Sequence, residues 1–125
     1  MVIEIPPNTS VSALRTFFNI VKQWKLGADE ARVLLGVPST TFLRWKKAAE
    51  SATLSRDTLE RISCIFGIYK ALHTIYAEPA VADDWLRRRN DNPLFDGQAP
   101  LTRMLSGCAA DLLIVRQHLD AHVFE

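Results

Sequence analysis

The chain has 125 residues, 48% of them apolar, and a formal net charge of +1 at pH 7. This length and composition suit one compact unit or two small helical units that share a core, and they exclude a largely disordered chain. No segment approaches roughly 18 uninterrupted apolar residues, and the first residues lack the basic and apolar regions of a secretion signal. We therefore expect a cytoplasmic protein with no membrane partner.

Charge is distributed unevenly along the sequence. Residues 1–58 contain eight Lys or Arg against five Asp or Glu, a net charge of +3, whereas residues 59–125 contain seven against nine, a net charge of −2. The two halves are therefore expected to contact different partners. One copy of the mildly basic front half would hold DNA only weakly, so tight binding would require a dimer or a larger assembly.

The chain begins with a predicted extended arm over residues 1–10, because a short apolar and polar alternation there ends at Pro6 and Pro7. From Ser12 onward, apolar residues recur at steps of three and four, which predicts a helix that ends over residues 25–27. The apolar face of this helix consists of Leu14, Phe17, Phe18, Val21 and Trp24.

Residues 28–49 predict two helices joined by a tight turn. The first helix ends at Gly36, a residue that tolerates positive φ. Pro38 cannot continue that helix easily, and Ser39 is a good N-cap for the second one. This is the pattern of a helix-turn-helix, and we interpret residues 11–54 as a DNA-binding domain of three helices.

The second helix of the motif carries the predicted DNA-reading surface. Phe42, Trp45 and Ala49 share one face, which is expected to pack, while the opposite face is small, polar and basic. Short donors and an Arg on such a face suit the base edges of a major groove. We predict base contacts from Thr40, Thr41 and Arg44 and phosphate contacts from Ser39, Lys46 and Lys47.

Two other interpretations of this motif stay open. An ordinary helical hairpin would have the same polar face, exposed only to solvent. In the first helix, Arg32 occupies the place, four residues before Gly36, where such motifs usually carry a small residue. This departure favours, more weakly, a front unit that mediates oligomerisation and binds no DNA.

The strongest structural signal is a long helix over residues 56–77, whose apolar residues recur at steps of three and four. Gly67 lies in the middle of this helix at a cost of about 1 kcal/mol, which favours the close approach of another helix, such as that of a second copy. Simple tolerance of the glycine is an equally good interpretation. The predicted dimerisation residues are Ile65, Gly67, Ile68 and Leu72.

The rest of the chain predicts shorter helices and one apolar turn. Residues 90–100 are a dense cluster of turn residues around Leu94 and Phe95. Helices are predicted over residues 79–89, 101–106 and 109–123. The fold is therefore predicted to be all-α, with a front helix-turn-helix unit joined by a long central helix to a second helical domain over residues 55–125.

The sequence contains no recognisable catalytic or cofactor motif. No P-loop, G-x-G-x-x-G or G-x-S-x-G occurs, and neither Cys64 nor Cys108 has the surroundings of a nucleophile or the spacing of a redox pair. His118 and His122 lie four residues apart, but a third suitably spaced ligand is missing. We therefore expect no enzyme activity, no metal and no cofactor, and reduced thiols that are partly or fully buried.

The back half contains an ordered run of motifs. They are Leu-Glu-Arg-Ile at 59–62, Gly-Ile-Tyr-Lys-Ala-Leu-His at 67–73, Trp-Leu-Arg-Arg at 85–88, Asn-Pro-Leu-Phe-Asp-Gly at 92–97 and Pro-Leu-Thr-Arg-Met-Leu-Ser-Gly at 100–107. Over residues 28–122, this run and the helix-turn-helix closely resemble the Xre-type antitoxins of the MbcA/ParS/Xre family. Within that family, the chain is most similar to antitoxins encoded beside RES-domain toxins.

The resemblance implies a function in a bacterial type II toxin-antitoxin system. Such an antitoxin binds a RES-domain toxin, which depletes NAD, and neutralises it by obstructing its active site. It also represses its own operon by binding operator DNA, and it forms a homodimer within a larger toxin-antitoxin complex. The alternative is a stand-alone helix-turn-helix regulator whose C-terminal region only dimerises.

The resemblance also implies that residues 92–97 and 107–124 face the toxin. Predicted toxin contacts are Arg88, Leu94, Phe95, Arg116, Leu119, Val123 and Phe124. For Leu119 and Val123, a place in the core is an equally good interpretation, and for Leu94 and Phe95 the core is slightly favoured. Phe124 is included because an aromatic residue near the end of a chain suits an interface better than a core.

Overall fold

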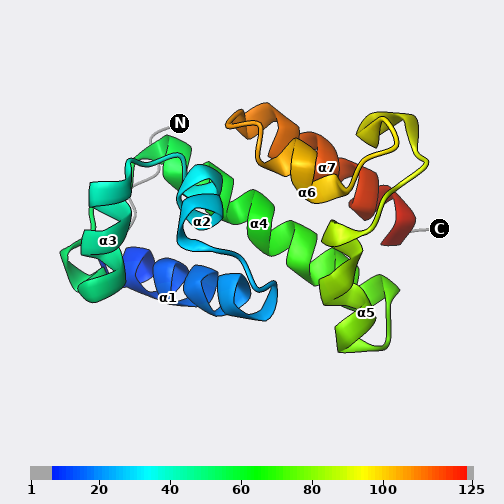
Figure 1. Ribbon diagram of the computed structural model, residues 1–125. Helices are drawn as coiled ribbons and strands as arrows, with labels where there is room; N and C mark the ends of the chain where they lie inside the picture. Colours follow the sequence, from blue (N-terminus) through cyan, green and yellow to red (C-terminus); the bar gives the residue numbers. More distant parts are fainter. Residues whose placement is uncertain (1–6, 124–125) are drawn as a thin grey trace. The chain divides into compact units, whose positions relative to one another are not determined.

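The computed structural model describes residues 7–123, and the regular elements of that range are helices only (Figure 1). The all-α prediction is confirmed. The chain divides into two compact units, Met1–Ile62 and Ser63–Glu125, and the boundary falls inside helix α4, Arg56–Ile75. The predicted domain boundary lies before this helix instead, and that assignment stays a prediction.

The first unit contains α1 (Pro7–Gln23), α2 (Ala28–Leu35), α3 (Ser39–Lys47), the short helix η1 (Ala49–Ser51) and the first residues of α4. Apolar side chains from four of these helices form its core: Leu14, Phe17, Ile20, Trp24, Ala31, Leu34, Leu35, Phe42, Trp45 and Ile62. The predicted face of α1 is largely confirmed, except that Ile20 is buried whereas Phe18 and Val21 are only half-buried.

Helix α1 begins at Pro7, earlier than the predicted start at Ser12. The extended-arm prediction is therefore wrong for residues 7–10, while residues 1–6 lie outside the described range. Proline is favourable at the first position of a helix, because its fixed φ suits the helix and its missing N–H would have no partner there. The second proline of the pair therefore starts a helix, where the sequence analysis expects an arm.

The turn between α2 and α3 has the predicted geometry. Gly36 adopts φ 72° in the left-handed region, and its backbone N–H donates to the carbonyl oxygens of Arg32 and Val33. Pro38, and not Ser39, occupies the N-cap position of α3, so Ser39 is the first helical residue. The helix ends two residues earlier than predicted, at Lys47.

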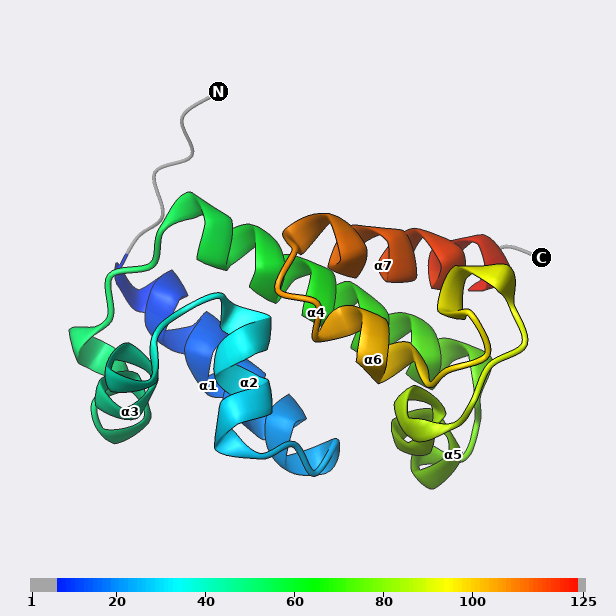
Figure 2. The same ribbon diagram turned by 45° about the horizontal axis from the view of Figure 1, so that its top comes forward.

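The second unit contains the rest of α4, then α5 (Pro79–Asp84), η2 (Trp85–Arg87), η3 (Pro93–Phe95), α6 (Pro100–Met104) and α7 (Ala109–Val123). Figures 1 and 2 both show α6 and α7 beside α4. The core of this unit consists of Ile65, Ile68, Ala71, Leu72, Ala82, Leu86, Phe95, Leu101, Met104, Leu112, Val115 and Leu119. Among the helices of residues 7–123, none combines the length and the hydropathy of a membrane span.

The predicted dimerisation residues are occupied within the single chain. Ile65, Ile68 and Leu72 are fully buried, and a Cβ atom at Gly67 would overlap the side chain of Arg116 from α7. Gly67 therefore accommodates a neighbouring helix of its own chain, as its missing side chain suggests. Ile65, Ile68 and Leu72 thus belong to the core of one chain, Gly67 is half-buried, and the role of these four residues in a homodimer stays a prediction.

Candidate functional site

Helix α3 has one buried and one exposed face. Phe42 and Trp45 are 3% and 4% exposed, and α3 contacts α2 and η1. At 100° per residue, the side opposite Phe42 and Trp45 carries Thr40 and Lys47 at its centre, which places both away from the core. The exposed face, which we call the α3 outer face, consists of Ser39, Thr40, Leu43, Arg44 and Lys47, all of which are exposed.

The structure separates the six predicted DNA contacts into three groups. Ser39, Thr40, Arg44 and Lys47 lie on the α3 outer face. Thr41 is half-buried at its border, which makes it a poorer candidate for a base contact. Lys46 is exposed on the opposite border. Leu43 is not among the predicted contacts, although the helical rotation of 100° per residue places it between Ser39 and Lys47.

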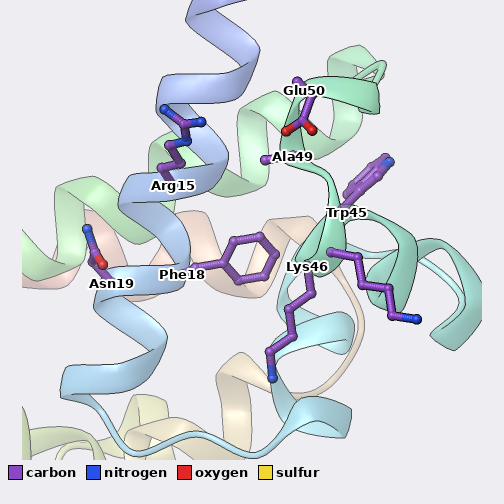
Figure 3. Close-up of a pocket in the computed structure, with 8 residues that line it drawn as sticks. Arg15, Phe18, Asn19, Trp45, Lys46, Ala49 and Glu50 are labelled. Carbon is purple, nitrogen blue, oxygen red and sulfur yellow. The ribbon is translucent and has the colours of Figure 1, made fainter.

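A hollow of about 390 Å³ lies in the first unit between α1 and the end of α3 (Figure 3). Phe18 projects toward it from α1, with Arg15 and Asn19 on the same helix, and Lys46 and Glu50 come from the opposite wall. Its lining residues are Arg15, Phe18, Asn19, Trp45, Lys46, Lys47, Ala49 and Glu50. Three of these eight side chains are cationic and one is anionic, so the hollow favours an anion such as a phosphate group.

The cations around this surface are not neutralised by neighbours. In the described range, Arg15, Arg44, Lys46 and Lys47 have no carboxylate within 4.0 Å. Residues 39–49 contain no Asp or Glu at all. Exposed cations without carboxylate partners are the electrostatic feature expected of a domain that contacts phosphates.

In the second unit, a polar network holds the turn over residues 92–97 against α6 and α7. Arg103 Nη1 donates to the carbonyl oxygen of Leu94 at 2.6 Å, and Arg103 Nε donates to Asp111 Oδ1 at 3.0 Å. Ser106 Oγ donates to the other oxygen of Asp111 at 2.5 Å. Within the turn, Asn92 Oδ1 accepts from the backbone N–H of Leu94 at 3.0 Å. The turn is thus a fixed structure, and its backbone is positioned by one arginine.

Helix α7 also has distinct buried and exposed faces. Leu112, Val115 and Leu119 are at most 2% exposed. Residues at steps of three and four on another side are exposed, and we call them the α7 outer face: Ala110, Leu113, Gln117 and Ala121. Leu113 is 45% exposed, although it directly follows the buried Leu112 in the sequence.

Both units match known families, in chain order. Residues 11–65 match the antitoxin Xre-like helix-turn-helix domain, and residues 71–122 match the antitoxin Xre/MbcA/ParS C-terminal toxin-binding domain. The chain is also 48% identical over 109 residues to a Sinorhizobium fredii protein named uncharacterized protein y4oB, an alignment that covers 86% of this chain and 81% of that protein. The chain belongs to the Xre/MbcA/ParS antitoxin family. The resemblance noted in the sequence is confirmed at the level of the family.

The family match shows an Xre-type antitoxin with a helix-turn-helix domain followed by a toxin-binding domain. At Arg32 the chain departs from the small residue that helix-turn-helix motifs usually carry there, and the structure explains this departure. Ala31 is fully buried and supplies the small residue of α2, whereas Arg32 is partly exposed and its Nε donates to Asp29 Oδ1 at 2.7 Å. The small residue is therefore displaced by one position, and Arg32 does not enter the core.

The structure divides the predicted toxin contacts of this antitoxin between core and surface. Phe95 and Leu119 are 3% and 2% exposed, so the core interpretation is confirmed for both and their side chains offer no contact surface. Leu94 and Val123 are half-buried. Arg88 is exposed and pairs with Asp84 at 2.8 Å. Phe124 lies outside the described residues.

Arg116 is the predicted toxin contact with the most definite structural surroundings. Its Nη1 donates to the carbonyl oxygen of Ser63 at 3.1 Å, and its side chain lies against Gly67. The side chain remains 35% exposed and also lies 3.6 Å from Asp120 Oδ2. Arg116 therefore joins α7 to α4, and a partner could reach only its exposed edge.

His118 and His122 make ring contacts in the antitoxin. Their ring centroids lie 4.6 Å apart, and His118 also meets Phe95 edge to face at 5.6 Å. Burial and then the neighbouring His122 lower the pKa of His118 below its ordinary value of 6.5. A neutral ring is therefore favoured, which suits contact with an aromatic core residue.

Of the two cysteines, Cys64 is half-buried as expected, whereas Cys108 is exposed, contrary to the prediction.

Asp111 is expected to make the stability of this unit depend on pH. Hydrogen bonds from Ser106 and then Arg103 lower the pKa of Asp111 below its ordinary value of 3.8. A lowered pKa stabilises the folded state above pH 3.8, and this contribution is lost as the pH falls through the folded-state pKa. Denaturation of the wild type and Asp111→Asn between pH 7 and pH 2 should give a difference in unfolding free energy that shrinks below pH 3.8.

Asp120→Asn is the matched control for this measurement, because its carboxylate lies 3.6 Å from Arg116, beyond hydrogen-bond distance. The comparison separates the loss of the hydrogen-bonded carboxylate of Asp111 from the loss of any one negative charge on α7. A difference for Asp111→Asn that stays constant down to pH 2 would contradict the assigned role of the carboxylate charge.

Proposed function

We propose that this antitoxin binds a RES-domain toxin, which depletes NAD, and neutralises it by obstructing the toxin's active site, while its front unit represses its own operon. The observation that carries the proposal is the match of a helix-turn-helix model and a toxin-binding model, in that order, on one chain. The choice of a RES-domain partner rests on the resemblance of the back half. We place the protein in the bacterial cytoplasm, acting by binding and not as an enzyme.

The toxin surface that we propose lies in the second unit. It combines the turn over residues 92–97, the exposed Arg88, the exposed edge of Arg116 and the α7 outer face. The turn and α7 are held together by Arg103 and Asp111, so a partner would meet a preformed surface. The exposed Leu113 is its best apolar candidate for an interface anchor.

The test is the NAD content of cells that express the neighbouring reading frame, with and without this chain. We expect NAD to fall only when the chain is absent, and the two proteins to co-purify. Truncation at Gly107 would remove core residues as well as the α7 outer face, so Leu113→Arg, a surface change, is the sharper variant. The Leu113→Arg variant should fold as the wild type does but no longer protect cellular NAD.

Arg44→Ala serves as the matched control in that assay. Arg44 is exposed on α3 in the other unit, and its replacement should leave NAD protection intact while operator repression is lost. If NAD is unaffected in every case and no partner co-purifies, the toxin part of the proposal fails and the chain is a stand-alone regulator. Protection that survives Leu113→Arg would exclude the α7 outer face as the toxin surface.

Binding of duplex DNA by the α3 outer face is the second part of the proposal. Arg44→Ala should reduce discrimination between preferred and unrelated duplexes by roughly 1–3 kcal/mol, because an Arg that contacts a guanine edge contributes about that much to discrimination. Gel-shift titration against a panel of duplexes measures this. Unchanged affinity and unchanged preference would remove Arg44 from the interface.

Lys47→Ala should instead weaken all duplexes alike, and it should reduce the slope of log affinity against log salt by roughly 0.9 for the one phosphate contact that is lost. Arg15→Ala should do the same if the hollow of Figure 3 receives a phosphate.

We also propose that the antitoxin binds DNA as a homodimer within a larger complex, since one copy carries few unpaired cations. Analytical sedimentation at the protein concentration of the gel-shift titration measures the oligomeric state.

A further inference from the structure

We propose that Leu43 contacts the C5-methyl group of a thymine in the major groove of the operator. The inference rests on the proposed DNA-binding function and names one base that the operator must contain. Leu43 and Leu113 are the two large apolar side chains that stand exposed in the described part of the chain, and Leu43 is the more exposed of them, at 55%. It is also the one that belongs to the predicted DNA-reading helix.

The position of Leu43 on α3 separates it from the core residues of the same helix. Phe42 precedes it and is 3% exposed, whereas Ser39 and Lys47, one turn to either side of Leu43, are both exposed. Leu43 and Arg44 flank the centre of the α3 outer face, on opposite sides of Thr40. A ligand that covers this face must therefore accommodate one apolar group between hydroxyl and cationic groups.

The charge of the α3 outer face identifies the kind of ligand. Arg44 and Lys47 have no carboxylate partner in the part of the chain that the structure describes, so the complementary ligand is an anion with a broad surface. Duplex DNA is such a ligand, and its major groove exposes one apolar group among the bases, the thymine methyl. An exposed leucine on a helix that enters the groove therefore has one chemically matched target.

A second copy of the chain is a poorer occupant of this face. Two α3 outer faces brought together would place Arg44 and Lys47 near the same residues of the other copy, and residues 39–49 contain no acidic side chain to offset the repulsion. Contact with DNA removes the same repulsion by pairing these cations with phosphates.

The test uses duplexes selected from a random-sequence pool by the full-length wild-type chain. Each thymine of the selected site is replaced in turn by deoxyuridine, which lacks only the methyl group. Affinities of the wild type and Leu43→Ala are then measured for each pair of duplexes. Leucine and alanine have similar helix propensities and the side chain is exposed, so the variant should fold as the wild type does.

At one thymine or more, the wild type should bind the deoxyuridine duplex about fourfold more weakly, the effect of one lost methyl contact. Leu43→Ala should bind the thymine duplex and the deoxyuridine duplex with equal affinity. A site selected from the same random pool with Leu43→Ala should lose the preference for thymine at that position alone. Leu43→Met, which keeps an apolar side chain, should restore the difference. Arg44→Ala, the matched control, should retain the deoxyuridine effect while its guanine preference is lost.

Two results would overturn the inference. The wild type could bind every deoxyuridine duplex as tightly as its thymine counterpart, or Leu43→Ala could keep the full deoxyuridine effect. A fall in sedimenting mass for Leu43→Ala, with an unchanged deoxyuridine effect, would assign the leucine to contact with a second copy. In these cases DNA binding itself survives; a wild type that binds no duplex, even at low salt, would overturn the DNA-binding proposal together with this inference.

Discussion

Leu119→Ala should lower the free energy of unfolding by about 2–5 kcal/mol, the usual cost of removing a fully buried leucine side chain. Leu119 is 2% exposed and lies on the buried face of α7 with Leu112 and Val115. Part of the loss is the transfer free energy of the removed atoms, and part is the cavity that the neighbours fill incompletely. Urea denaturation followed by circular dichroism measures the change.

Leu113→Ala is a closely matched control, because it makes the same substitution on the same helix at a side chain that is 45% exposed. Its cost should stay within about 0.5 kcal/mol, as for most surface substitutions. The pair also separates two reasons for a loss of toxin binding, since Leu119→Ala would act through folding and Leu113→Ala through the surface. Equal costs for the two variants would contradict the assignment of Leu119 to the core.

Gly36→Ala should destabilise the first unit by about 2 kcal/mol. Gly36 has φ 72°, and a residue with a Cβ atom in that region costs roughly 1–2 kcal/mol. The new Cβ atom would also lie 2.7 Å from Arg61 Nε, so Arg61 must move from its pairing with Asp57, at 2.8 Å. Thermal or urea denaturation measures the total, and Gly36→Asn should cost less because Asn tolerates this conformation better.

Gly97→Ala isolates the backbone part of this effect. Gly97 has φ 75°, nearly that of Gly36, but its Cβ atom would meet no atom within 4 Å in the described structure. The excess cost at Gly36 therefore measures the displacement of Arg61, and it should vanish when both variants are compared in an Arg61→Ala background. If the two glycines cost the same in the wild type, Arg61 moves at no cost and only the backbone matters.

The helix-turn-helix could be predicted from the sequence because its turn depends on local chemistry. Gly36 supplies the left-handed residue and Pro38 interrupts the helix, and neither effect needs information from the rest of the fold. The same holds for α4, where Thr58 N–H donates to Ser55 Oγ at 3.1 Å and the apolar residues follow the helical period. Local signals of this kind set the elements and most of the core.

The exposed side chains could not be predicted in the same way. In α7, apolar residues surround the helix, with Leu113, Ile114 and Val115 in succession, so periodicity does not choose which of them is buried. That choice depends on which residues α4 and α6 cover. Arg103 is a second example, because its contacts with Asp111 and Leu94 join residues eight and nine positions apart that lie in different elements. On α3, by contrast, the helical rotation of 100° per residue is enough to place Leu43 on the outer face and Thr41 at its border.

The contact of Arg116 with Gly67 also fixes how far α7 can slide along α4. A slide by one helical turn, about 5.4 Å, would bring Leu112 or Asp120 to the position of Arg116. Leu112 would leave the core, where it is 1% exposed, and Asp120 would offer an acceptor where the carbonyl oxygen of Ser63 needs a donor. The glycine and the arginine together thus favour a single register for a helix whose apolar residues alone would allow several.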